Sequence, residues 1–128
     1  MQKTCMESSN NKKTGNNGEE RAAKFLAHAG YRVLERNYRS RYGEVDIIVC
    51  KYDTVVFVEV KTWPNGDFFS LAQSVGKQKQ KRIIKTAKCF LAEHRQYNEY
   101  YVRFDLIALD MPGHDEIYHI ENAFSEIL

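Results

Sequence analysis

The stretch that decides the fold is VDIIVCKYDTVVFVEVK, residues 45–61, which contains two apolar strands and the turn between them. Residues 45–50 and 55–61 are rich in β-branched side chains, as is typical of buried strands. A two-residue turn at Tyr52 and Asp53 fixes the register of the hairpin. The predicted pairs are Cys50 with Val55, Ile48 with Phe57, Asp46 with Glu59, and Glu44 with Lys61.

Further elements are predicted on both sides of this hairpin. Apolar residues at helical spacing indicate helices over residues 19–29 and 74–94, and Gly30 ends the first of them. Strands are predicted over residues 31–35, 103–109 and 116–120, with an Arg-rich turn at 37–43 and a second turn at 111–115. This order predicts an α/β fold with a mixed central sheet flanked by helices.

Composition limits the classes to which the chain can belong. Its 128 residues are 43% hydrophobic and 28% charged, with 19 Lys and Arg against 17 Asp and Glu, which gives a net charge of +2. The length predicts one domain, at residues 15–128, and the polar, Asn-rich start of the chain predicts a flexible tail at residues 1–14. The near-neutral charge excludes a histone-like polycation. Apolar runs are too short for a membrane span. Three cysteines without a C-x-x-C pair favour free thiols and a cytoplasmic location.

The predicted register gathers charged residues at one end of the sheet. Asp46 faces Glu59, and two opposed carboxylates with Cβ atoms about 5 Å apart destabilise a sheet. One interpretation is that Lys61 neutralises them at a solvated strand end. The other is that Mg²⁺ or Mn²⁺ binds between them, because these cations prefer carboxylate oxygens. In that case Lys61 would hold or deprotonate an attacking water, or neutralise charge on a phosphate.

Glu19 is a third acid that the sequence directs inward. At 100° per residue it lies at the centre of the apolar helix face that contains Ala22, Leu26 and Ala29. A carboxylate in such a position is costly unless it meets a cation or hydrogen-bond donors. The alternative is a first-turn acid that is favoured by the helix dipole and reaches solvent.

An inward Glu, a strand Asp and a following Glu-x-Lys together resemble the PD-(D/E)xK, or restriction-endonuclease-like, superfamily. The chain resembles more narrowly the YraN-like bacterial family, which is similar to archaeal Holliday junction resolvases. The matching segments are GEE (18–20), RNYR (36–39), GEVDIIV (43–49), VFVEVKT (56–62), V-x-x-x-K-Q-x-R (75–82) and RFDLIAL (103–109). They occur in the family's order and spacing across residues 15–124. Trp63 departs from the pattern, since Arg is common there in relatives.

The resemblance implies a fold, an activity and a set of site residues. The fold is a restriction-endonuclease-like α-β-β-β-α-β core, and the activity is Mg²⁺-dependent (or Mn²⁺-dependent) hydrolysis of phosphodiester bonds in DNA, including branched or recombination DNA. The implied catalytic residues are Glu19, Asp46, Glu59 and Lys61. The implied metal ligands are Asp46, Glu59 and the backbone carbonyl of Val60. Because resolvases act on two-fold substrates, the resemblance also implies a homodimer.

Basic residues are concentrated in two stretches. The predicted second helix carries a stripe formed by Lys77, Lys81, Lys85 and Lys88, and it directs Lys79 toward the sheet. Arginines interleaved with tyrosines at residues 31–42 form the other stretch, a pattern that suits phosphate contacts and base stacking. The candidate nucleic-acid-binding residues are Arg36, Arg39, Arg41, Lys77, Lys79 and Arg82. Two further alternatives are a non-catalytic nucleic-acid-binding module in DNA repair or recombination and a protein-interaction scaffold.

Overall fold

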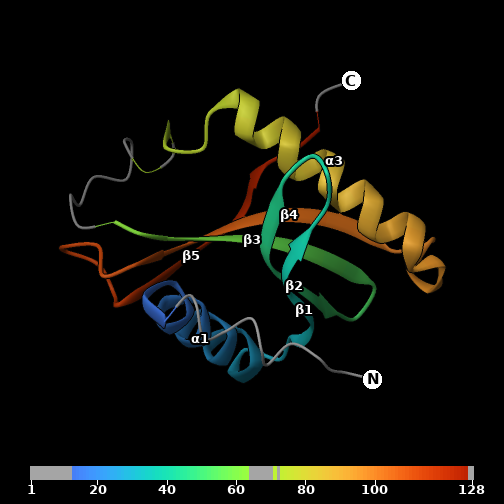
Figure 1. The fold of residues 1–128 in the computed structure, drawn as a ribbon. Coiled ribbons are helices and arrows are strands. Elements are labelled where there is room, and N and C mark those ends of the chain that lie inside the picture. The colour runs from blue at the N-terminus through green and yellow to red at the C-terminus, as the bar shows by residue number, and fades with distance from the viewer. Residues whose placement is uncertain (1–12, 64–70, 72, 127–128) are drawn as a thin grey trace.

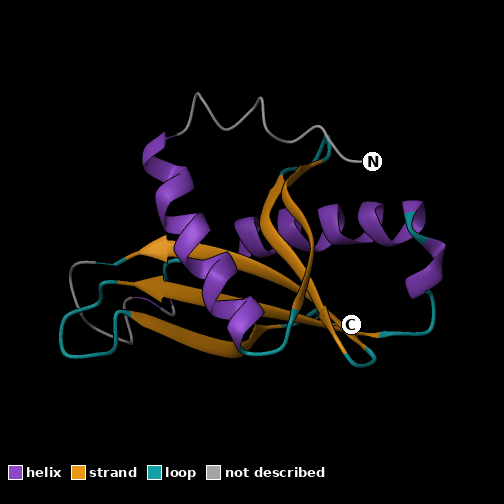
Figure 2. Ribbon diagram, turned by 90° about the horizontal axis from the view of Figure 1, so that it is seen from below, coloured by secondary structure: helices purple, strands orange, loops and turns teal. Residues whose placement is uncertain are grey.

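The computed structural model describes residues 13–63, 71 and 73–126, and it contains one five-stranded sheet with a helix on each face (Figures 1 and 2). The elements in chain order are α1 (Lys13–His28), β1 (Arg32–Arg39), β2 (Glu44–Lys51), β3 (Thr54–Thr62), α3 (Lys77–Glu93), the short 3-10 helix η2 (Arg95–Tyr97), β4 (Tyr101–Leu109) and β5 (Ile117–Phe124). In the described part of the chain, no helix is long and apolar enough to cross a membrane.

The strands lie in the sheet in sequence order, β1-β2-β3-β4-β5. All neighbouring strands are antiparallel except β3 and β4, which are parallel. The connection between these two contains α3, as a crossover between parallel strands requires. The predicted α/β class is confirmed, and the order of elements is compatible with a restriction-endonuclease-like core.

Each face of the sheet has its own apolar core. On one face, Leu26 of α1 packs with Ile47 and Val58. On the other face, Phe90 of α3 packs with Ile48 and Phe57. Adjacent strand residues thus enter opposite cores, as the two-residue period of a strand requires. Burial on both faces explains why β2 and β3 are almost continuously apolar.

The hairpin of β2 and β3 follows the predicted register along most of its length. Cys50 pairs with Val55 and Ile48 pairs with Phe57, as predicted. The ladder ends at the pair Ile47 and Val58, so the predicted pairs of Asp46 with Glu59 and Glu44 with Lys61 do not form.

Local bending of β2 explains where the ladder ends. Val45 and Ile48 lie in the same core although an uninterrupted strand would place them on opposite faces. In β1, Asn37 has a φ of 54°, which is outside the β region. The first residues of β2 therefore leave β3, and the Asp46 carboxylate accepts the Val60 N–H at 2.8 Å.

Several predicted boundaries also differ from the structure, among them the start of α3 at Lys77 and of β4 at Tyr101. Helix α1 begins at Lys13, so it includes residues that the sequence assigned to the tail; residues 1–12 lie outside the described part. Gly18 lies inside this helix, and because a Cβ there would lie 2.9 Å from Leu109 Cδ1, its absent side chain lets α1 pack closely against β4. Strand β1 continues to Arg39 and β5 to Phe124, both beyond their predicted ends.

Candidate active site

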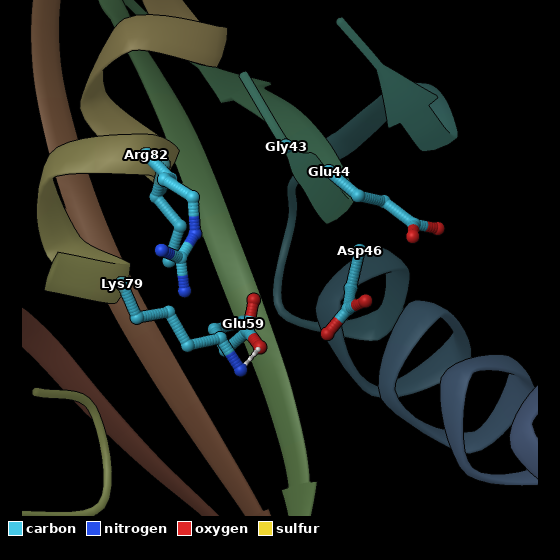
Figure 3. Close-up of a pocket in the computed structure, with 7 residues that line it drawn as sticks. Gly43, Glu44, Asp46, Glu59, Lys79 and Arg82 are labelled. Carbon is cyan, nitrogen blue, oxygen red and sulfur yellow. Dashed lines mark ion pairs between the residues drawn. The ribbon is translucent and has the colours of Figure 1, made fainter. Parts of the chain in front are cut away.

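Acidic residues from the sheet and basic residues from α3 line one pocket of about 280 Å³ (Figure 3). The sheet contributes Glu44 and Asp46 of β2 and Glu59 of β3. Helix α3 contributes Lys79 and Arg82. Gly43 and Ile83 complete the lining. The structure therefore brings together five charged residues from three elements.

Packing of the β1–β2 turn against α3 holds one wall of this pocket. A Cβ on Gly43 would lie 3.3 Å from the Cβ of Arg82, so the absent side chain permits a close approach. The hydroxyl groups of Ser40 and Thr86 lie 2.8 Å apart and join the turn to the middle of the helix. The acidic end of β2 is thereby fixed beside the first turns of α3.

Asp46 and Glu59 both line the pocket, and their carboxylates influence each other. Burial and the charge of Glu59 raise the pKa of Asp46 to about 8, although the hydrogen bond from the Val60 N–H opposes the rise. The two carboxylates are thus electrostatically linked, as the sequence predicted, but through the end of the ladder and not as a directly opposed pair.

Glu59 has a cationic partner from α3. The Lys79 Nζ lies 2.7 Å from Glu59 Oε2, and the side chains are 37% and 10% exposed, respectively (Figure 3). Lys79 does point toward the sheet, as its helical position predicted. The sequence did not identify it as the partner of Glu59.

Glu19 lies on α1, beside the sheet residues of the site. Its Oε1 is 4.0 Å from Arg36 Nη2, and its side chain is 15% exposed. After burial and Glu59, the charge of Glu19 adds to the rise in the pKa of Asp46. The inward direction predicted for Glu19 agrees with this placement.

Lys61 is half-buried and follows Glu59 by two residues on β3, but it is not among the residues that line the pocket. Its assignment as the residue that activates water stays a prediction. Lys79 occupies the position beside Glu59 at which a cation was expected. The sequence does contain a signal for this contact. Lys79 precedes the apolar Ile83 by four residues, and residues four apart lie on the same face of a helix.

The other predicted nucleic-acid-binding residues differ in their surroundings. Arg82 is exposed at the pocket, and Lys77 is exposed at the start of α3. Arg36 pairs with Glu20 of α1 at 2.9 Å, and Arg39 lies 3.8 Å from Glu44. The guanidinium of Arg41 and the ammonium of Lys85 each lie 5.2 Å from the centre of the Tyr42 ring. Tyr42 thus brings the basic side chains of Arg41 in the turn and Lys85 in α3 close to each other, whereas Arg36 and Arg39 lie near acids.

The donor set of the pocket fits a hard divalent cation. Within residues 13–63, 71 and 73–126, no three His, Cys, Asp or Glu side chains converge on one metal position. Mg²⁺ is typically held by only one or two carboxylates, because it keeps several waters. Asp46 and Glu59 supply carboxylates from neighbouring strands, and burial together with the charge of Glu59 raises the pKa of Asp46. A bound cation would offset both the burial of the Asp46 carboxylate and its repulsion by Glu59.

Comparison with known proteins identifies the family. The model described as "Uncharacterised protein family UPF0102" matches residues 18–109. A UPF0102 protein from Treponema pallidum (strain Nichols) is 46% identical over 122 residues, which cover 92% of this chain and 97% of the relative. One from Vibrio parahaemolyticus is 42% identical over 112 residues, which cover 88% of this chain and 92% of the relative. The chain therefore belongs to the UPF0102 (YraN-like) family.

Proposed function

We propose that this protein is a Mg²⁺-dependent endonuclease that hydrolyses phosphodiester bonds in DNA, and that branched or recombination DNA is its substrate. The observation that carries the proposal is the pocket in which Asp46 and Glu59 lie beside basic residues of α3. Carboxylates that repel phosphate are of use to a DNA-binding pocket only when a cation stands between them and the substrate.

Asp46, Glu59 and the main chain at Val60 would hold the cation. In a strand, the N–H and C=O groups of one residue point to the same side. Because the Val60 N–H donates to Asp46, the Val60 carbonyl also faces the side on which Asp46 lies. Three oxygen donors would thus face one position, as the family resemblance implied. A bound Mg²⁺ would polarise the phosphoryl oxygen and lower the pKa of a bound water.

Other residues of the site would act around this position. Lys61 would orient or deprotonate the attacking water, and Glu19 would support a metal-bound water or a second cation. Arg82, Lys77 and the basic residues near Arg41 would bind the phosphate backbone on either side of the cleaved bond.

A homodimer is part of the proposal for four-way DNA, because two strands related by a two-fold axis need two sites. The free thiols of Cys50 and Cys89 suit the cytoplasm.

The proposal is tested by incubating the purified full chain with linear, flapped and four-way DNA in Mg²⁺ or Mn²⁺. We expect metal-dependent cleavage of at least one branched substrate, and a fall of at least about 100-fold in rate for Glu59→Gln, as for removal of other catalytic groups. A matched control is Glu99→Gln, an exposed acid beyond η2. Lack of cleavage by the wild-type chain on every substrate would count against an enzyme.

The second candidate function is a nucleic-acid-binding module that acts in DNA repair or recombination without turnover. The exposed lysines of α3 and the contacts of Arg41 and Lys85 with Tyr42 support it independently of the acids. The two functions differ in the effect of Asp46→Ala on DNA affinity without metal. Above about pH 8, where Asp46 is ionised without metal, a pure binder gains affinity when the repelling carboxylate is removed, and it shows no Asp46-dependent Mn²⁺ binding.

A further inference from the structure

The ion pair between Lys79 and Glu59 joins the acidic strand side of the pocket to its basic α3 side. Its Nζ–Oε2 distance is 2.7 Å, which is a direct charged hydrogen bond. Glu59 comes from the central strand β3, whereas Lys79 lies in the first turn of α3, the element that carries the basic stripe. The pair therefore connects the predicted metal ligands with the predicted phosphate-binding surface (Figure 3).

The Lys79 and Glu59 side chains differ in burial, and this difference determines which of them can move. Glu59 is 10% exposed and is fixed on a central strand, so it needs a positive partner where it stands. Lys79 is 37% exposed and has four rotatable methylenes, so its ammonium can leave without opening the core. Only the lysine can move at low cost.

A divalent cation and the Lys79 ammonium would compete for the same carboxylate. Charges of +2 and +1 bound to one carboxylate would stand within about 5 Å of each other and repel strongly in a half-buried site. Entry of the cation would therefore require the ammonium to leave Glu59. Arg82 lines the same pocket, so a released ammonium would join a second base where a phosphate would lie.

We propose that Lys79 is a resident counter-ion of Glu59, which a divalent cation displaces, and that the displaced ammonium then binds a phosphate of the nucleic acid. The inference rests on the proposed function, because it concerns the cation and the phosphate of that site. It makes metal and DNA binding mutually reinforcing, since a coupling free energy between two ligands acts equally in both directions.

The first test is calorimetric titration of Mn²⁺ into the wild-type full chain, Lys79→Gln and Lys81→Gln. Lys81 is exposed on the same helix, and Lys81→Gln removes the same charge. It therefore controls for the effect of the net charge of α3 on cation binding. We expect Lys79→Gln to bind Mn²⁺ about tenfold more tightly than the wild-type chain, and Lys81→Gln to change the affinity at most about twofold. Lys79→Arg, which keeps a cation, should resemble the wild-type chain.

The second test compares the affinity for a four-way DNA in Ca²⁺ and in EDTA. We expect Ca²⁺ to raise DNA affinity for the wild-type chain and for Lys81→Gln by the same factor, and this factor to be smaller for Lys79→Gln, in which only the direct contact of the cation with phosphate is left. An equal Mn²⁺ affinity for Lys79→Gln and Lys81→Gln, or an unchanged Ca²⁺ factor, would overturn the inference alone. Tighter Mn²⁺ binding by Lys79→Gln without cleavage by any protein would overturn the proposed function alone. Absence of Mn²⁺ binding by all of them would overturn both.

Discussion

Asp46 binds a proton more tightly in the folded chain than in the unfolded one. Burial and the charge of Glu59 raise its pKa to about 8, against about 4 in an unfolded chain. Between these two values the folded chain binds more protons than the unfolded chain. The free energy of unfolding therefore falls as pH rises through this range, and the cost is fully present only above the folded pKa.

Without metal, we expect Asp46→Asn to be more stable than the wild-type chain by about 1–3 kcal/mol at pH 8.5. The asparagine carbonyl can still accept the Val60 N–H, so only the charge is removed. The difference should vanish below about pH 4. Urea unfolding in EDTA at several pH values measures it, with the exposed Asp115→Asn as control. A less stable Asp46→Asn at pH 8.5 would show that the carboxylate is stabilising there.

At the scale of elements, one buried carboxylate holds β4 and β5 together. Asp105 is completely buried on β4, where it accepts hydrogen bonds from Arg103 at 2.9 and 2.8 Å and from the Asn122 N–H of β5 at 2.9 Å. Its Oδ2 also lies 2.7 Å from His119 Nε2. Burial alone would raise the pKa of Asp105, but these contacts outweigh it and lower the pKa.

Removal of this carboxylate should therefore destabilise the fold and not the site. We expect Asp105→Ala to cost about 3–5 kcal/mol, because it leaves Arg103 partly buried without its main partner. The more exposed neighbour Glu121, 3.8 Å from Arg103, should cost less than about 1 kcal/mol when changed to Gln. Denaturant unfolding at neutral pH compares the two variants. The Asp105 contribution should disappear as pH falls through its lowered pKa; a cost near that of Glu121→Gln would contradict this assignment.

Helix α3 should contribute to DNA affinity mainly through its outer lysines. The double variant Lys77→Gln/Lys85→Gln should weaken binding to all DNA sequences alike. It should also reduce the slope of log affinity against log salt by about 0.9 for each phosphate that the protein no longer neutralises. Fluorescence anisotropy between about 50 and 200 mM salt measures the slope. Lys24→Gln on α1, across the sheet, is the matched control. Equal slopes for Lys77→Gln/Lys85→Gln and Lys24→Gln would show that the DNA does not bind along α3.

The register of the β2–β3 hairpin could be predicted from the sequence along most of its length. A two-residue turn and a two-residue period suffice to predict the pairing of Cys50 with Val55 and Ile48 with Phe57. The end of the ladder could not be predicted this way, because it follows from the local bending of β2 beside the irregular residue Asn37 of β1. The contact of Lys79 with Glu59 depends on how α3 packs beside the β1–β2 turn, so both residues could be located from sequence but not their pairing.

At the scale of the whole molecule, the net charge of +2 conceals a separation of charge. Acids of α1, β2 and β3 lie within electrostatic reach of one another around Asp46, and α3 brings its lysines and Arg82 to the edge of the same pocket. The sequence alone could predict that acids and bases fall on different elements. It could not predict that they meet in one pocket, because this follows from α3 crossing between the parallel strands β3 and β4.

The central claim is that this pocket holds a divalent cation through Asp46 and Glu59. Titration of Mn²⁺ followed by the paramagnetic resonance signal of the free ion counts bound ions directly. We predict that the wild-type chain removes at least one equivalent of Mn²⁺ from solution near pH 8.5 and that Asp46→Asn and Glu59→Gln do not. Binding that is absent in the wild-type chain, or that is unchanged in both variants, would contradict the account.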